Sequence, residues 1–357
     1  MEITYQEVSF QDVIDGIQIK DDCYGLAKEC FSEARKAAFL SNPFLIDKTT
    51  TMVLLARVDG VVCGKRMFFP TRIYASGEEI QAFGGSNYYV HQDYRKYALG
   101  GALILYAAKK KNNFLLSAGC SNNSIKIYEA LKGSVFYIPS FKQVRRSIFL
   151  IDRTSVKSFA FSLLDSVKSF FLYPFVIIAR ISNGKYRMRY EVTQLKTVPQ
   201  WIEDMVKNDG HKYMELHNKD WFEWNLNNSF AKDPYDVQKL FSVYDNKKPV
   251  GFFLIKERKV GKKVIGSLME WQTADETRLS EVDIVRLAMM YFSKNVMEVI
   301  ISSLDQQVQL YCGVKHGFVV SRSQNIVCKD LKKQYPDSSD ISNWRIRPGY
   351  ADVIMSK

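Results

Sequence analysis

The sequence contains no run of apolar residues long enough, at about 18, to cross a bilayer as a helix. It also lacks C-x-x-C spacing among its six cysteines, and its four histidines are scattered. These absences argue against a zinc site and against a disulfide framework, so no metal is expected. The opening residues Met1-Glu2-Ile3 do not resemble a secretory signal. Together these features favour a protein of the reducing cytoplasm.

Acidic residues are fewer than basic ones: 38 Asp and Glu stand against 50 Lys and Arg, a net charge of +12. Such an excess favours a polyanionic partner, which can be a nucleic acid, an anionic lipid or a phosphate-rich small molecule. The sequence has no zinc-finger spacing, basic zipper or aromatic RNA-binding signature, so nucleic acid is not the expected partner. A solvated basic surface explains the charge equally well, and peripheral contact with a membrane stays open.

The length of 357 residues predicts about two domains. In the first part of the chain, hydrophobic periodicity and turn residues predict helices at 26–39, 99–111 and 124–131, and strands at 52–58, 61–69, 80–90 and 114–118. The same order returns later, with strands at 240–244, 250–256, 264–273 and 297–302, and helices at 281–294 and 305–314. The two sets lie about 185 residues apart, which predicts an internal duplication.

The segment 155–181 between the two sets is predicted to be a helix broken by Pro174. Its apolar residues fall on one helical face: Phe159, Leu163, Val167, Phe170 and Phe171. Lysines alternate with these aromatic residues, so one interpretation is a helix that lies on a membrane surface. The interpretation that we favour is an interdomain helix whose apolar face packs between the two halves.

A second informative segment runs from Val90 to Leu103, where a strand is followed by a helix that begins with small residues. The first backbone N–H groups of a helix have no partner within the helix and lie at the positive end of its dipole. Small residues at Ala98, Gly100 and Gly101 let a phosphate approach these amides closely. The alternative is a glycine-rich turn that binds no ligand.

A further motif follows in the segment 117–133, which contains Asn122 and Asn123, either of which is a candidate helix cap, then Tyr128 and Gly133. Together the two segments resemble the GNAT family of acyl-CoA-dependent N-acyltransferases. The family's first motif, R/Q-x-x-G/A-x-G/A, is matched by Arg95, Ala98 and Gly100. Its second, N-x(4–5)-Y-x-x-x-G, is matched approximately. Ala98 stands where glycine is commoner, and Val135-Phe136 follows Gly133 where Phe usually comes at once.

The resemblance implies an α/β (mixed α+β) fold of two GNAT-like domains in tandem, each with a largely antiparallel central sheet flanked by helices. The expected boundaries are 1–152 for the acyl-CoA-binding domain, 153–184 for the linker helix and 185–357 for a degenerate second domain. Between Gln272 and Met290 the second half has no R-x-x-G-x-G spacing, and Tyr311 is a doubtful equivalent of Tyr128.

As an activity, the resemblance implies transfer of an acyl group, most simply from acetyl-CoA, to an amine such as an amino sugar in polysaccharide synthesis. The stretch Lys219–Trp224 and the terminal Trp344…Asp352 are weakly similar to the polysaccharide-linked group. Two alternatives stay open: an aminoacyl-tRNA-dependent ligase of the FemAB kind, and a non-catalytic binding module. Binding of acyl-CoA would distinguish the acyltransferase from the ligase, and turnover of acyl-CoA with an amine would distinguish it from the binding module.

The resemblance also assigns roles to residues. Tyr128 is the candidate general acid for the departing thiolate, and His91 and Glu79 are the candidate bases unless water relays the proton. Backbone amides near Tyr89 and Val90 would hold the thioester carbonyl. The residues expected to bind the coenzyme are Tyr89, Val90, Arg95, Lys96, Tyr97, Ala98, Leu99, Gly100, Gly101, Asn122, Asn123 and Tyr128.

Overall fold

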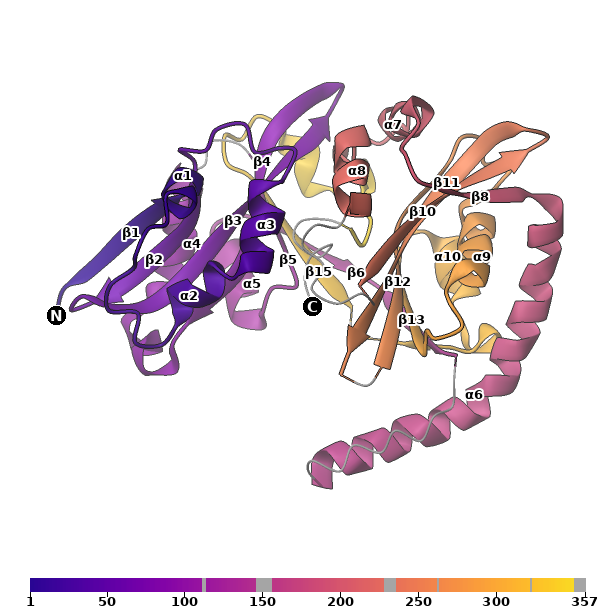
Figure 1. Cartoon of the computed structure of the whole chain (residues 1–357), viewed down its shortest axis with the longest axis horizontal. Coiled ribbons are helices and arrows are strands. Elements are labelled where there is room, and N and C mark those ends of the chain that lie inside the picture. The colour runs from indigo at the N-terminus through magenta and orange to yellow at the C-terminus, as the bar shows by residue number, and fades with distance from the viewer. Residues whose placement is uncertain (111–113, 146–155, 228–235, 262, 322, 350–357) are drawn as a thin grey trace. The chain divides into compact units, whose positions relative to one another are not determined.

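The computed structural model describes residues 1–110, 114–145, 156–227, 236–261, 263–321 and 323–349. The chain divides into two compact units (Figure 1). Unit 1 contains 1–137, 206–230 and 325–357, and unit 2 contains 138–205 and 231–324. The predicted domains, 1–152 and 185–357, are each one continuous stretch of sequence, whereas each compact unit is assembled from separate segments.

Unit 1 is built on a sheet with the strand order β1-β2-β3-β4-β5-β15-β6. The strands are β1 (Ile3–Ser9), β2 (Thr51–Val58), β3 (Val61–Ala75), β4 (Glu78–Val90), β5 (Phe114–Ala118), β15 (Gln324–Asp330) and β6 (Ser134–Ile138). Two short strands, β9 (Tyr213–Glu215) and β16 (Trp344–Arg345), extend it beside β3. The β4–β5 pair is parallel, while β1 to β4 form an antiparallel series.

The helices of unit 1 are α1 (Phe10–Ile14), α2 (Leu26–Cys30), α3 (Glu33–Leu40), α4 (Leu99–Lys110), α5 (Asn122–Ala130) and α8 (Lys219–Asn227), with 3-10 turns η1 (Gln92–Tyr97), η3 (Pro336–Ser339) and η4 (Ile341–Asn343). The single helix predicted over 26–39 is wrong, because the chain forms two helices there. Ser32 has an extended backbone (φ −58°, ψ 142°), which ends one helix and begins the next.

Helix α4 is fixed to the sheet by its first turn. Leu99 and Leu103 are fully buried and pack in one apolar cluster with Leu54, Phe68 and Val90 of β2, β3 and β4. Full burial of a leucine side chain contributes about 1.5–3 kcal/mol. The start of α4 is therefore held close to the carboxyl end of β4.

Unit 2 has the strand order β14-β7-β13-β12-β11-β10-β8, with β12 and β13 parallel. The strands are β14 (Phe318–Val320), β7 (Ser140–Val144), β13 (Glu298–Ser302), β12 (Lys263–Thr273), β11 (Lys248–Val260), β10 (Val237–Asp245) and β8 (Glu191–Leu195). The remaining helices are α6 (Val156–Arg189), α7 (Gln200–Lys207), α9 (Glu281–Tyr291) and α10 (Gln306–Tyr311), with a 3-10 turn η2 (Val314–His316).

The two sheets repeat one topology. Strand β2 begins at Thr51 and β10 at Val237, 186 residues later, and β5 begins at Phe114 and β13 at Glu298, 184 residues later. These intervals agree with the predicted duplication. The two sheets also exchange one strand each. Strand β7 follows β6 of the first sheet in sequence but lies between β13 and β14 of the second, and β15 follows β14 of the second sheet but lies between β5 and β6 of the first.

Helix α6 contains Pro174 without ending there, so the predicted break is wrong. A proline removes one backbone hydrogen bond and crowds the preceding turn, which bends a helix that is held elsewhere; the ribbon changes direction along its length (Figure 1). Val176, Ala179 and Asn183 of α6 are buried, and α6 packs on α9 and η2 of unit 2. Gly317 is required at this contact, because a Cβ there would lie 2.4 Å from the Val176 side chain.

Within the described residues, no helix combines the length and the apolar character that crossing a membrane requires.

Candidate functional site

Strands β4 and β5 separate at the carboxyl end of β4. Their parallel pairing ends at Gly85 and Ser117, whereas β4 continues to Val90. Beyond the last pair, β4 has a bulge in which Asn87 adopts a left-handed conformation (φ 45°), and the β3–β4 register shifts there. Among the described residues, the part of β4 beyond Gly85 is thus paired on one edge only, and its other edge is directed toward the region that β5 has left.

Val90 presents its backbone to this open edge. The His91 N–H donates to the Cys63 carbonyl of β3, so by antiparallel alternation the Val90 amide points away from β3 and the Tyr89 amide toward it. The Val90 carbonyl instead accepts a hydrogen bond from the Arg95 Nε–H at 3.2 Å. Of the two amides predicted to hold a thioester carbonyl, only that of Val90 faces the gap.

The first turn of α4 lies next to this strand end. Ala98 adopts a left-handed conformation (φ 55°) after the η1 turn, and the first helical hydrogen bond runs from the Ala102 N–H to the Ala98 carbonyl. The amides of Leu99, Gly100 and Gly101 therefore precede the helical ladder, where they form the positive end of the helix dipole. Arg95, Lys96 and Ala98 are exposed beside them, and Tyr97 is half-buried.

The two glycines of this turn differ in what surrounds them. A Cβ at Gly100 would lie 2.2 Å from the Tyr88 hydroxyl oxygen, so the small residue is needed for Tyr88 to pack there. A Cβ at Gly101 would have no heavy atom within 4 Å. Burial raises the pKa of the Tyr88 hydroxyl, which therefore stays protonated and can donate a hydrogen bond. Open space for an anion is found at Gly101.

A buried polar cluster lies where β4 and β5 part. The Tyr128 hydroxyl of α5 accepts a hydrogen bond from Arg66 Nη2 of β3 at 2.6 Å and shares another with Ser117 Oγ of β5 at 2.9 Å. Arg66, Ser117 and Tyr128 are all under 5% exposed. A Cβ at Gly85 would lie 2.5 Å from both Arg66 Nη2 and Ser117 Oγ, so the absence of a side chain there makes room for the cluster.

The Arg66 guanidinium is only partly paired. Its Nε and Nη1 atoms are buried and have no hydrogen-bond partner, and among the described residues no carboxylate forms an ion pair with it. A buried cation with unused donors is costly to the folded state and attracts negative charge. The cluster thus combines a phenol, a hydroxyl and a cation with the capacity to stabilise an anion.

Comparisons with known proteins bear on the fold. Neither a protein-family model nor a curated protein matches the chain. Solved structures that resemble it include a GCN5-related N-acetyltransferase from Anabaena variabilis (TM-score 0.54, 10% identity, covering 92% of this chain and 73% of that one). A probable N-acyltransferase from Enterococcus faecalis has a TM-score of 0.54 at 11% identity, covering 93% and 73%. N-myristoyltransferase from Saccharomyces cerevisiae, with myristoyl-CoA bound, has a TM-score of 0.52 at 11% identity, covering 91% and 82%.

The chain has the GNAT fold. The predicted fold class is confirmed: mixed α and β, with two mostly antiparallel sheets flanked by helices. At such low identity the likeness establishes the fold, and the reaction has to be argued from the residues of the site.

The second GNAT motif is capped differently from the prediction. Ser121 is the N-cap of α5, since its side chain accepts from the Ser124 N–H, while Asn122 and Asn123 are exposed in the first turn. The preceding loop is held by Asn325 of β15, which accepts from the Cys120 N–H at 2.6 Å and donates to the Cys120 carbonyl at 3.0 Å. The structure brings Tyr128 to the site but leaves both asparagines at the surface.

The two candidate bases are not brought to Tyr128. Glu79 lies at the start of β4, six residues before Gly85, where it forms ion pairs with Arg72 (2.8 Å) and Lys207 (3.0 Å). Burial raises the pKa of the Glu79 carboxyl, but the hydrogen bonds from Lys207 and Arg72 outweigh this effect, and the net lowering of the pKa makes it a weak base.

His91, the other candidate, is part of an aromatic cluster. Its ring stacks on Tyr24 with centroids 3.8 Å apart, and its Nδ1 lies 3.5 Å from Asp93. Tyr24 thus holds the His91 ring beside the end of β4, although the two residues lie far apart in the sequence. Sequence spacing gave no indication of that partner.

Unit 2 has a corresponding helix with the opposite charge at its start. Ser280 caps α9 by accepting from the Asp283 N–H, and Glu281 and Asp283 place carboxylates in the first turn. Carboxylates in the first turn lie at the positive end of the helix dipole and repel any anion that approaches it. Tyr311 of α10 contacts helix α6, accepting from Asn183 Nδ2 at 2.8 Å, so it does not reproduce the Tyr128 arrangement.

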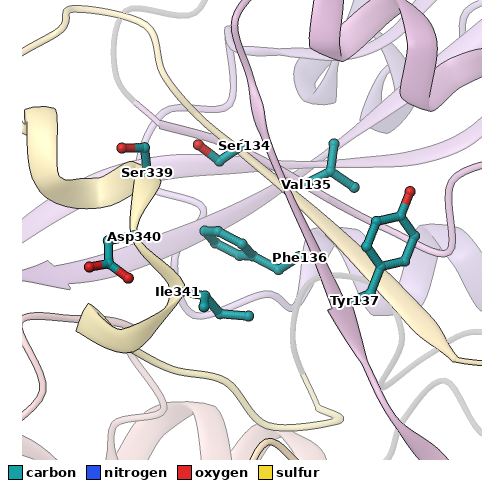
Figure 2. A pocket seen from close by; sticks show the side chains of 7 residues that line it. All are labelled: Ser134, Val135, Phe136, Tyr137, Ser339, Asp340 and Ile341. Carbon is teal, nitrogen blue, oxygen red and sulfur yellow. The ribbon is translucent and has the colours of Figure 1, made fainter.

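A shallow pocket of about 390 Å³ lies elsewhere in unit 1. Figure 2 shows its lining, which comes from β6 and from the segment around η3 and η4: Ser134, Val135, Phe136, Tyr137, Ser339, Asp340 and Ile341. None of these residues belongs to the predicted coenzyme site. Trp344, of the weakly similar terminal stretch, is buried nearby and donates from its ring N–H to the Ser338 carbonyl, which gives it a structural role; Asp352 lies outside the described residues.

Arg66 allows a prediction about stability. Replacing it with methionine, which is apolar and of similar length, should raise the free energy of unfolding by about 1 kcal/mol or more, because a partly paired buried charge is removed. Thermal or urea unfolding of the Arg66→Met variant measures this. A large loss of stability would instead mean that the guanidinium serves to hold the fold together.

Proposed function

We propose that the protein is an acyl-CoA-dependent N-acyltransferase, with acetyl-CoA or another short acyl-CoA as donor and an amine, such as an amino sugar, as acceptor. The observation that carries this proposal is the arrangement within unit 1: the unpaired edge of β4, the open turn at Gly101 and the buried Tyr128 hydroxyl are parts of one sheet end. The GNAT fold supports it independently.

The residues present fit the proposed donor. The pyrophosphate would be held by the first amides of α4 on the Gly101 side, with Arg95 and Lys96 adding positive charge from the exposed η1 turn. The Val90 N–H would donate to the thioester carbonyl and stabilise the negative charge that develops on its oxygen. The thioester supplies an activated acyl group, which an amine can attack without prior covalent attachment to the protein.

Tyr128 would act as the general acid. As the new C–N bond forms and the C–S bond breaks, the departing thiolate needs a proton, and the Tyr128 hydroxyl would supply it. An ordinary phenol is a weaker acid than an ordinary thiol, so this transfer needs assistance. Arg66 would provide it, because its Nη2–H already donates to the phenol oxygen and would stabilise the negative charge left there.

The proton of the attacking amine would pass to water or to His91. The Glu79 carboxylate, whose pKa is lowered by two cationic neighbours, is the poorer of the two predicted bases. Because stacking on Tyr24 holds the His91 ring in place, relay of the proton by water is the route that fits the structure best.

The test is turnover. Purified protein incubated with acetyl-CoA and a panel of amino sugars, nucleotide-linked sugars, polyamines and peptides should release free thiol and add an acetyl mass to one class of amine. Release that depends on the amine supports the proposal. Coenzyme binding without any turnover would favour a binding module. If acetyl-CoA is not bound and the protein uses an aminoacyl-tRNA donor, the ligase alternative replaces it.

A further inference from the structure

Helix α6 carries a row of large apolar side chains on its solvent side. Phe170, Phe171 and Ile181 are 64%, 68% and 74% exposed, and Val167, Ile177 and Ile178 are exposed as well. Most exposed apolar residues of a folded protein occur singly, whereas a continuous row marks an interaction surface.

The row follows the helix period. Each of positions 167, 170, 171, 174, 177, 178 and 181 lies three or four residues from at least one other of the set, which aligns them on one face. At about 3.6 residues per turn, residues two positions apart lie about 200° from each other around the helix. The buried residues Val176 and Ala179 are therefore on the other side, against unit 2. One face of α6 anchors the helix and the opposite face is apolar and exposed.

The charge of the helix indicates what covers this face. Helix α6 contains six basic residues and one acidic residue; the basic ones are Lys157, Lys168, Arg180, Lys185, Arg187 and Arg189, and the acidic one is Asp165. Amphipathic helices with aromatic and aliphatic residues on one face and an excess of cations bind at the headgroup region of anionic bilayers. A second copy of the chain fits less well, because two such helices would bring like charges together.

We propose that α6 binds the surface of an anionic lipid bilayer, with the row from Val167 to Ile181 inserted at the boundary between headgroups and acyl chains. Lys185 and Arg189, which are exposed and continue the same face at steps of four residues, would contact the headgroups. The helix lies along the membrane plane and does not cross it. This inference does not depend on the proposed acyl transfer, and it is tested by binding alone.

The first experiment is sedimentation of the full chain with vesicles. The fraction bound to phosphatidylcholine vesicles containing about 30% phosphatidylglycerol should exceed that bound to pure phosphatidylcholine at least about tenfold, and should fall as salt is raised. Equal binding to both vesicles, or binding to neither, would overturn the proposal.

Matched variants locate the contact. Phe170→Glu with Ile178→Glu should reduce vesicle binding at least about tenfold, because both charges fall within the inserted row. The control is Leu310→Glu with Val320→Glu, which makes the same change in net charge at two exposed apolar positions of unit 2 outside α6. Equal losses in the two pairs would show that the protein's charge alone binds lipid, and would remove α6 from the proposal.

A direct contact is read from Phe171→Trp. Vesicles of brominated lipid should quench the fluorescence of this variant more than that of the wild-type protein, whose five tryptophans lie outside α6. Light scattering after size exclusion tests whether a second copy of the chain covers the row instead. A wild-type dimer that does not bind vesicles, and that Phe170→Glu with Ile178→Glu converts to a monomer, would assign the row to a second copy and contradict lipid binding.

Discussion

Replacing Gly101 with glutamate should weaken acetyl-CoA binding at least about 100-fold, which corresponds to about 2.7 kcal/mol. The new carboxylate would project into the open space at the first turn of α4, where the pyrophosphate is proposed to bind. Two like charges would then compete for the same amides at the positive end of the helix dipole. Titration calorimetry with acetyl-CoA measures the loss.

The Gly101 variants come with their own controls. Glutamate is a better helix former than glycine and is favourable in a first turn, so stability should be kept or improved and unfolding cannot explain the loss. Gly101→Ala, which meets no heavy atom within 4 Å, should bind nearly as well as the wild-type protein. Gly100 is a poorer test site, because any Cβ there displaces Tyr88. Undiminished affinity in Gly101→Glu would remove the proposed coenzyme site.

Tyr128→Phe should lower kcat about 100-fold or more while leaving acetyl-CoA affinity within about threefold of wild type. Only the hydroxyl is lost, and with it the proton for the thiolate. Steady-state thiol release and calorimetry separate the two quantities. Tyr311→Phe is the matched control, since Tyr311 is also a buried tyrosine whose hydroxyl is hydrogen-bonded, at the corresponding place in unit 2. It should keep the wild-type kcat.

The role of Arg66 is separable by combining substitutions. Arg66→Met should also reduce kcat, and Arg66→Lys should restore part of it. If Arg66 acts through the phenol, adding Arg66→Met to Tyr128→Phe should cost little more than Tyr128→Phe alone. Fully additive losses would show that the guanidinium acts on another group. An unchanged kcat in Tyr128→Phe would retire this tyrosine as the acid while leaving the fold unaffected.

Much of the local structure follows from the sequence alone. The strand predicted at 114–118 has the observed limits, and the helix predicted from Leu99 begins at that residue. Period-2 and period-3.6 patterns of apolar residues, with turn residues between them, depend on neighbours close in sequence. Two of these predictions failed: Ser32 interrupts the helix predicted over 26–39, and α6 continues through Pro174 instead of breaking there.

The site was predictable only in part. The spacing of Arg95, Gly100 and Tyr128 pointed to the strand end and helix start that the structure brings together. Arg66 gave no such signal, because an arginine in a strand is ordinary until its burial against Tyr128 is seen. The same holds for Tyr88, whose hydroxyl explains Gly100, and for Asn325, which holds the loop before α5 from 205 residues away.

What the sequence determined by itself is the order of the elements, their repetition after about 185 residues and the resemblance to GNAT motifs, because each depends on residue types at short, fixed spacings. Tertiary structure decided which strands each sheet exchanges, which face of α6 is left exposed and which side chains surround the Tyr128 hydroxyl. These depend on contacts between residues far apart in the chain, and no local pattern records which distant partner a buried group will meet.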